Sequence, residues 1–326
     1  MRRFRTPITW LTCTLALAVA GCASSAESAE PDGPDTVYAP YVSATDASAG
    51  DTAGAPTAYN LAFVIADGDG CTPAWDGSEA LDDPAVKARI AALKKDGATV
   101  RVSFGGASGS ELARTCGSAA DLAAAYGRAL DAAGATRADF DVEGDTLADS
   151  ASVALRSRAI ALLQRERSDL DVSFTLPVMP SGLDADALAL LESANDHDVR
   201  VDTVNIMTMN YAESYTGDMG DYALASARAA HAQVRKVFGL SDADAWRGLA
   251  VTSMIGANDI EGETFTLADA ARVRKFAEDK DLARVSMWAS FRDRQCVAGR
   301  AGRDDAATDC SGVEQGPGAF GEALAG

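Results

Sequence analysis

The chain has 326 residues, a formal net charge of −19 and a hydrophobic content of 47%. Its acidity argues against a nucleic-acid partner, because phosphate backbones are bound through lysine and arginine. The length suits one large barrel domain, and the hydrophobic content suits a real core. Acidity itself indicates solubility rather than a particular function.

The first 36 residues are typical of an export signal followed by a tether. Three arginines within the first five residues precede an apolar run from Leu11 to Ala20, which is too short to span a membrane in the mature protein. Residues 19–22 read Val-Ala-Gly-Cys and resemble the lipobox of bacterial lipoproteins. This resemblance implies cleavage before Cys22 and attachment of lipid to it. The alternative is an ordinary secretory signal, with Cys22 incidental.

The lipobox interpretation divides the chain into three parts. Residues 1–21 form the signal peptide, residues 22–36 a flexible tether, and residues 37–326 one domain. We therefore expect an extracellular or cell-surface monomer that touches the bacterial membrane only through its lipid.

Four cysteines remain after the signal and the lipidated position are set aside. An even number in an exported protein predicts disulfide bonds. Three pairings are possible, and we favour the one that closes two local loops. It joins Cys71 to Cys116 and Cys296 to Cys310.

The sequence offers little for metal or histidine chemistry. No cysteine pair has CxxC spacing, and the two histidines, His197 and His231, fall on predicted helices. We therefore expect no metal site, no cofactor and no Ser-His-Asp triad, and we expect both histidines on the surface.

Along the chain, short β-rich runs alternate with alanine-rich helical segments. Eight such repeats predict a (β/α)₈ TIM barrel of α/β class. An open doubly wound sheet is the alternative, but no Gly-x-Gly-x-x-Gly follows the first strand. The predicted strands are Val37–Ser43, Tyr59–Ala66, Thr99–Phe104, Ala138–Val142, Asp171–Leu176, Thr203–Met209, Gly248–Met254 and Arg284–Ala289, and the predicted helices are Pro84–Lys95, Ala119–Ala133, Ala151–Arg167, Asp184–Ala194, Tyr222–Val237 and Leu267–Asp279.

The fourth predicted strand carries three acids in alternation. Asp139, Asp141 and Glu143 alternate with apolar residues such as Phe140 and Val142, so the acids share one face at intervals of about 6.6–6.8 Å. Like charges this close raise the pKa of at least one member. Glycoside hydrolysis uses such unequal carboxyl groups. An exposed acidic edge strand is the alternative, but the two apolar residues favour a strand buried on both sides.

This strand resembles the catalytic strand of glycoside hydrolase family 18, which contains chitinases and related endoglycosidases. The family pattern is Asp-x-x-Asp-x-Asp-x-Glu. Its last three acids match Asp139, Asp141 and Glu143, whereas Thr136 stands in place of the first. Glu143 also ends its strand, where barrel enzymes place catalytic groups.

Further motifs extend the resemblance over residues 37–312. Ser103-Phe-Gly105-Gly106 matches the second family signature, which supports the acids from below. Met207-Thr-Met209-Asn210-Tyr211 ends the sixth strand. Alternating methionines usually fill a core, but the family has a tyrosine here that binds the substrate acetamido carbonyl, and it maps onto Tyr211. Many relatives carry Asp where this chain has Asn210.

The resemblance implies further substrate contacts around the barrel mouth. Trp288 would form the floor under the −1 sugar, and Asn258 would line the cleft after the seventh strand. Relatives carry cis peptides at Trp288 and at the Ala62-Phe63 position. The substrate-binding set is Phe63, Gly105, Gly106, Met209, Asn210, Asn258 and Trp288.

The implied activity is endo-cleavage of β-1,4-linked N-acetylglucosamine polymers with retention, by a substrate-assisted route. Glu143 is the general acid, Asp141 orients the acetamido group, Asp139 shares a proton with Asp141, and Tyr211 holds the acetamido oxygen. The expected partners are chitin or chito-oligosaccharides.

The segment between the seventh and eighth strands leaves no room for the α+β insertion of relatives with a deep tunnel, so we expect an open cleft. Only 6% of residues are aromatic, which disfavours strong binding to crystalline chitin. Two alternatives remain: an endo-β-N-acetylglucosaminidase acting on N-glycan cores, and a non-catalytic sugar-binding barrel.

Overall fold

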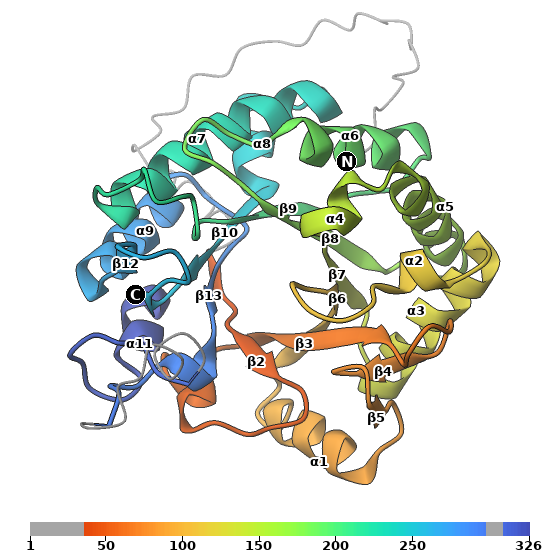
Figure 1. Cartoon of the computed structure of the whole chain (residues 1–326), viewed down its shortest axis with the longest axis horizontal. Helices are drawn as coiled ribbons and strands as arrows, with labels where there is room; N and C mark the ends of the chain where they lie inside the picture. Colours follow the sequence, from red (N-terminus) through yellow and green to blue (C-terminus); the bar gives the residue numbers. More distant parts are fainter. Residues whose placement is uncertain (1–35, 298–308) are drawn as a thin grey trace, which may run out of the picture.

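The computed structural model describes residues 36–297 and 309–326 (Figure 1). The predicted signal peptide, nearly all of the tether and the lipid site at Cys22 lie outside the described residues. No described helix is long and apolar enough to cross a bilayer.

The described chain forms the predicted (β/α)₈ barrel, with helices outside a ring of parallel strands (Figure 1). The first strand closes the ring in two pieces on either side of Pro40, which has no N–H for a strand ladder. Its first piece pairs with the last strand and its second piece with the next strand along the chain. The ring consists of β1 (Val37–Tyr38) with β2 (Tyr41–Ser43), β3 (Ala58–Ala66), β6 (Thr99–Gly105), β7 (Arg137–Asp141), β8 (Asp171–Pro177), β9 (Thr203–Met207), β10 (Leu249–Met254) and β13 (Arg284–Trp288).

The six predicted helices are also present, with ends shifted by up to three residues. Side-chain caps explain several starts: Asp83, Ser118 and Asp184 each accept backbone N–H groups at the first turn. These helices are α1 (Pro84–Leu93), α3 (Ala119–Ala133), α5 (Ser150–Glu166), α6 (Ala185–Asp196), α7 (Met219–Phe238) and α9 (Leu267–Asp279).

Short elements that we did not predict occupy the loops. The segment between β10 and β13 holds only a two-stranded hairpin and α9, so it contains no α+β insertion, as predicted. The short elements are η1 (Ala49–Thr52), β4 (Pro73–Trp75), β5 (Glu79–Ala80), α2 (Leu112–Thr115), α4 (Gly144–Ala148), α8 (Asp242–Arg247), β11 (Gly256–Ala257), β12 (Thr264–Phe265), η2 (Ser290–Arg292) and α11 (Ala319–Ala325).

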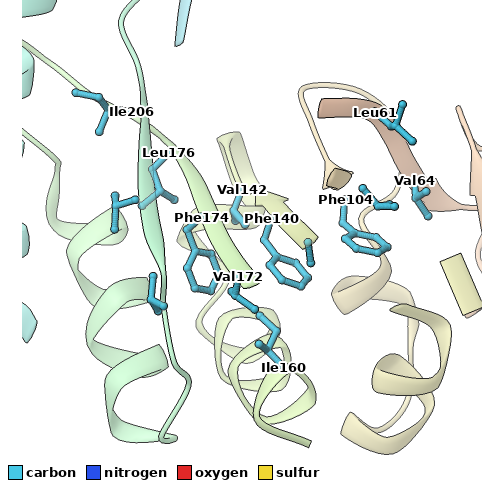
Figure 2. Close-up of a cluster of buried hydrophobic side chains, with 14 of the residues drawn as sticks. Leu61, Val64, Phe104, Phe140, Val142, Ile160, Val172, Phe174, Leu176 and Ile206 are labelled. Carbon is cyan, nitrogen blue, oxygen red and sulfur yellow. The ribbon is translucent and has the colours of Figure 1, made fainter. Parts of the chain in front are cut away.

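The layer between strands and helices is apolar and fixes the orientation of β7. Phe140 lies in register between Phe104 of β6 and Phe174 of β8, and all three are buried. Figure 2 shows these rings packed together with Ile160 of α5. Because side chains alternate along a strand, burying Phe140 on the helix side turns Asp139 and Asp141 into the barrel. The exposed-edge interpretation of this strand is therefore wrong.

Both disulfides join the predicted partners. Cys71 bonds to Cys116, and Cys296 bonds to Cys310. The expectation of surface histidines is wrong for His231, which is only 7% exposed. Its ring stacks on Trp246 of α8 with a centroid distance of 3.8 Å, because α8 folds back over that face of α7.

Candidate active site

Asp139 lies at the centre of the barrel and is fully buried. Strand register places Ser103 of β6 and Ser173 of β8 beside it, and their hydroxyls donate to its two oxygens at 2.7 and 2.6 Å. Thr175 and Tyr41 donate at 2.8 and 2.9 Å. Each oxygen of the Asp139 carboxyl group therefore accepts hydrogen bonds from two hydroxyls. Arg284, on the opposite side of the barrel, has a nitrogen 4.0 Å from the carboxylate of Asp139.

Asp141 lies two residues further along β7, nearer the mouth of the barrel. Its surroundings contrast with those of Asp139. Its Oδ1 is buried and has no hydrogen-bond partner among the described residues. Burial raises the pKa of Asp141 well above its ordinary value, and the charges of Glu143 and Asp139 raise it further. Within the described chain no hydrogen bond joins Asp139 to Asp141, so the expected proton sharing is not seen.

Glu143 follows β7 and precedes α4, without forming a capping hydrogen bond. It is half-buried. Burial raises the pKa of Glu143, and the charge of Asp259 adds to the effect. A carboxyl group with a raised pKa, at the end of a barrel strand, suits a general acid.

These acids open into a cavity of about 270 Å³ at the C-terminal ends of the strands. Phe63 and Trp288 stack at its edge with a centroid distance of 5.4 Å. Both aromatic positions carry cis peptide bonds, Ala62-Phe63 and Trp288-Ala289, as expected. The lining residues are Tyr41, Phe63, Ala107, Asp141, Glu143, Thr175, Pro177, Met207, Met209, Asn210, Thr252, Met254, Asp259 and Trp288.

Known proteins are similar to this chain in sequence and in fold. The chain is 32% identical over 279 residues to a probable bifunctional chitinase/lysozyme of Escherichia coli K12, and covers 31% of it. It is 31% identical over 278 residues to endochitinase 11 of Metarhizium anisopliae, and covers 53% of it. Each match spans 80% of this chain, so the chain corresponds to about a third and a half of these relatives' lengths. No family model matches the chain.

A solved structure is also similar to this chain in its fold. The catalytic domain of the hyperthermophilic chitinase from Pyrococcus furiosus superposes with a TM-score of 0.78 at 28% identity. The match covers 89% of this chain and 94% of that domain. The described barrel is therefore similar, in sequence and in fold, to chitinase catalytic domains.

One predicted contact of this chitinase-like domain is wrong in the structure. Tyr211 is 4% exposed and does not line the cavity. Its hydroxyl accepts a hydrogen bond from Ser226 of α7 at 3.3 Å, and its ring packs against Tyr215 and Tyr222. The chain turns sharply after β9, with φ of 53° at Asn210, which directs Tyr211 away from the acids. Met209 and Asn210 line the cavity instead.

Three other predicted contacts are displaced from the cavity of the chitinase-like domain. Asn258 is buried, and its amide donates to the backbone carbonyls of Met254 and Gly256. Gly105 and Gly106 serve close packing: a Cβ on Gly105 would lie 2.1 Å from the carbonyl oxygen of Asp141. A Cβ on Gly106 would lie 3.0 Å from the ring of Phe63. These three residues therefore support the cavity without lining it.

Residues that the sequence did not single out also line the cavity. Asp259 directly follows Asn258, the residue of this loop that we predicted to line the cleft, so the prediction fell one residue short. Tyr41 and Thr175 belong to predicted strands, but nothing in their local sequence singled them out. Among the described residues, no group of three acidic, histidine or cysteine side chains could hold a metal ion.

Proposed function

We propose that this chain hydrolyses β-1,4-linked N-acetylglucosamine polymers at internal bonds, with retention of configuration. The observation that carries the proposal is the contrast between the surroundings of the acids on β7 and just after it. The buried Asp139 has four hydroxyl donors, and Asp141 and Glu143 have raised pKa values and face an open cavity. The relatives named as chitinases support the choice of substrate.

Glu143 donates its proton to the glycosidic oxygen as the bond to C1 breaks. The acetamido oxygen of the substrate attacks C1 and forms an oxazolinium ion, so no protein carboxylate acts as nucleophile. Asp141 accepts the acetamido N–H as positive charge develops there. Its raised pKa and its unpartnered Oδ1 are consistent with a group that gains a partner only when substrate binds. Glu143 then deprotonates the water that opens the oxazolinium ring.

Trp288 and Phe63 supply the apolar faces on which a sugar ring stacks. The side chains of Met207, Met209 and Met254 add to the apolar lining of the cavity. Tyr211 has no direct contact role, because it lies outside the cavity.

The pH dependence of the rate follows from the proposed acid. Glu143 must carry its proton to act, so the rate falls as pH rises through its pKa. Because burial and Asp259 raise that pKa, we expect activity to extend to higher pH than an ordinary glutamate would allow. The pH profile of kcat/KM measures this limb directly.

The test is product analysis by mass spectrometry with N-acetylchitohexaose and with a high-mannose glycoprotein. We expect short N-acetylglucosamine oligomers from the first substrate alone, and a loss of about 10²–10⁴-fold in turnover in Glu143→Gln. Glu192→Gln, an exposed position on α6, is the matched control. Glycan release that leaves one N-acetylglucosamine on the protein would establish the endoglycosidase alternative. Binding without turnover would establish a sugar-binding barrel.

We also propose that the chain is exported and lipid-anchored to the bacterial surface as a monomer. Support comes from the basic start, the apolar run and the lipobox-like residues 19–22. Metabolic labelling with a fatty acid tests it: label in the wild type but not in Cys22→Ala is the expected result. Equal absence of label would favour the plain secretory signal.

A further inference from the structure

Asp259 is a third carboxylate in the wall of the cavity that holds Glu143 and Asp141. It comes from the loop between β11 and β12, whereas Asp141 ends β7 and Glu143 follows that strand. Asp259 is exposed to solvent, as expected of a group at the mouth of an open site.

The side chain of Asp259 is held by Asn210 from the end of β9. The Asn210 amide donates to Asp259 Oδ2 at 2.8 Å, and its Oδ1 accepts from the Asp259 backbone N–H at 2.9 Å. An aspartate at position 210 could not donate the first bond and would repel the carboxylate. The amide is therefore the residue type that this geometry needs.

The loop is also fixed from below. The guanidinium of the buried Arg292 donates to the carbonyls of Ile255 and Ala257 at 3.1 and 2.7 Å, and Asn258 bonds backbone carbonyls of the same segment. Because contacts on both sides of the loop hold it, the exposed carboxylate of Asp259 has a fixed position in the cavity wall.

Three titratable groups matter around Glu143. Asp141 and Asp259 lie in the same cavity, and Arg292 acts on Asp259 from beneath the loop. Burial lowers the pKa of Arg292 to about 10, so its guanidinium stays positive at neutral pH. A fixed negative charge beside an acid disfavours loss of its proton.

We infer that Asp259 is a positioning residue: its carboxylate, fixed by Asn210 in the cavity wall, keeps the acid proton on Glu143. The inference rests on the proposed role of Glu143 as general acid. The loop after β10 thus contributes to proton retention on Glu143, a contribution that the acids of β7 do not themselves provide.

The test is the pH profile of kcat/KM for a fluorogenic chitotrioside in wild type and Asp259→Asn. The amide can still bond Asn210, so the variant removes the charge and keeps the fold. We expect its alkaline limb to move to lower pH; each pH unit of movement lowers the rate above the limb by about tenfold. Added salt should shift the wild-type limb in the same direction and the variant limb much less, since solvent ions screen exposed charges.

A control and an independent readout complete the test. Asp279→Asn makes the same change on the outer surface of α9, where Asp279 pairs with Lys275 at 2.8 Å, and should leave the limb in place. An unmoved limb in Asp259→Asn, with a rate lowered equally at every pH, would show a merely structural role and overturn the inference. Glutamate-¹³C NMR measures the same titration without substrate, with the Glu143 signal identified by its loss in Glu143→Gln. A Glu143 titration unchanged by Asp259→Asn would also overturn the inference, whether or not the proposed substrate is correct.

Discussion

The loop after β6 is held by a buried ion pair whose loss should be costly. Glu111 is 6% exposed and Arg156 of α5 is 1% exposed, and they meet at 2.8 Å. Glu111 also accepts from the Tyr126 hydroxyl at 3.3 Å and from the Ala113 N–H at 2.9 Å, where it caps α2. The same loop carries Ala107 into the wall of the catalytic cavity.

Glu111→Ala removes the only acidic partner that the described chain gives Arg156. An uncompensated buried charge costs about 3–5 kcal/mol of unfolding free energy. At about 2 °C per kcal/mol for a domain of this size, Tm should fall by roughly 6–10 °C. Urea and thermal unfolding, followed by near-ultraviolet circular dichroism, measure both quantities.

Two further variants distinguish the effect of burial on the unfolding free energy from the effect of charge pairing alone. Asp131 pairs with Arg167 at the same distance, 2.8 Å, but is 66% exposed, so Asp131→Ala should cost less than about 1 kcal/mol. The double variant Glu111→Leu with Arg156→Met replaces the pair with apolar groups and should recover most of the loss. A cost below about 1 kcal/mol for Glu111→Ala, or equal costs for the buried and exposed pairs, would refute the reasoning.

Other predictions follow from single contacts. Tyr211→Phe should leave kcat within about threefold of wild type, since the hydroxyl bonds Ser226 rather than facing the cavity; a loss of 10²-fold in a kinetic assay would restore its predicted role. Gly105→Ala should destabilise the fold by at least about 1–3 kcal/mol, because φ is +100° and its Cβ would strike a carbonyl oxygen; wild-type urea stability would contradict this. Asp141→Asn should raise stability at neutral pH while abolishing turnover. The native carboxyl keeps its proton to higher pH than the unfolded one, so stability is lost as pH rises through that window; a pH–stability curve identical to wild type would exclude the effect. Reducing the Cys71–Cys116 bond, which closes 45 residues, should cost about 2–4 kcal/mol, measured by unfolding of the double serine variant; an unchanged midpoint would count against it.

The barrel was predictable because the alternation of strand and helix patterns is repeated along the chain. Each strand and helix carries its own periodicity, and the eight repeats support one another even where an end is misplaced. The ends are the weak point: β9 stops at Met207, two residues before the predicted end. Beyond Met207 the side chains no longer alternate between the two faces of a strand. Tyr211 lies in this segment, and the role predicted for it is wrong.

The disulfides and the cis peptides were predictable for different reasons. Local loops between cysteines are the cheaper ones to close in an exported chain, which favoured the observed pairing. The cis positions followed only from family resemblance, since nothing in Ala62-Phe63 or Trp288-Ala289 marks them locally.

The sequence by itself determined which acids share a face. The alternation of Asp139, Asp141 and Glu143 is a property of the covalent chain once it is extended, and the apolar residues between them dictate which side is buried. The tertiary structure decided how those acids differ. Asp139 receives hydroxyls from Tyr41 and Ser173, which are 98 and 34 residues away, and the charge that faces Glu143 comes from a loop on the far side of the barrel. Protonation depends on distance and burial in space, and ring closure alone brings these distant groups together.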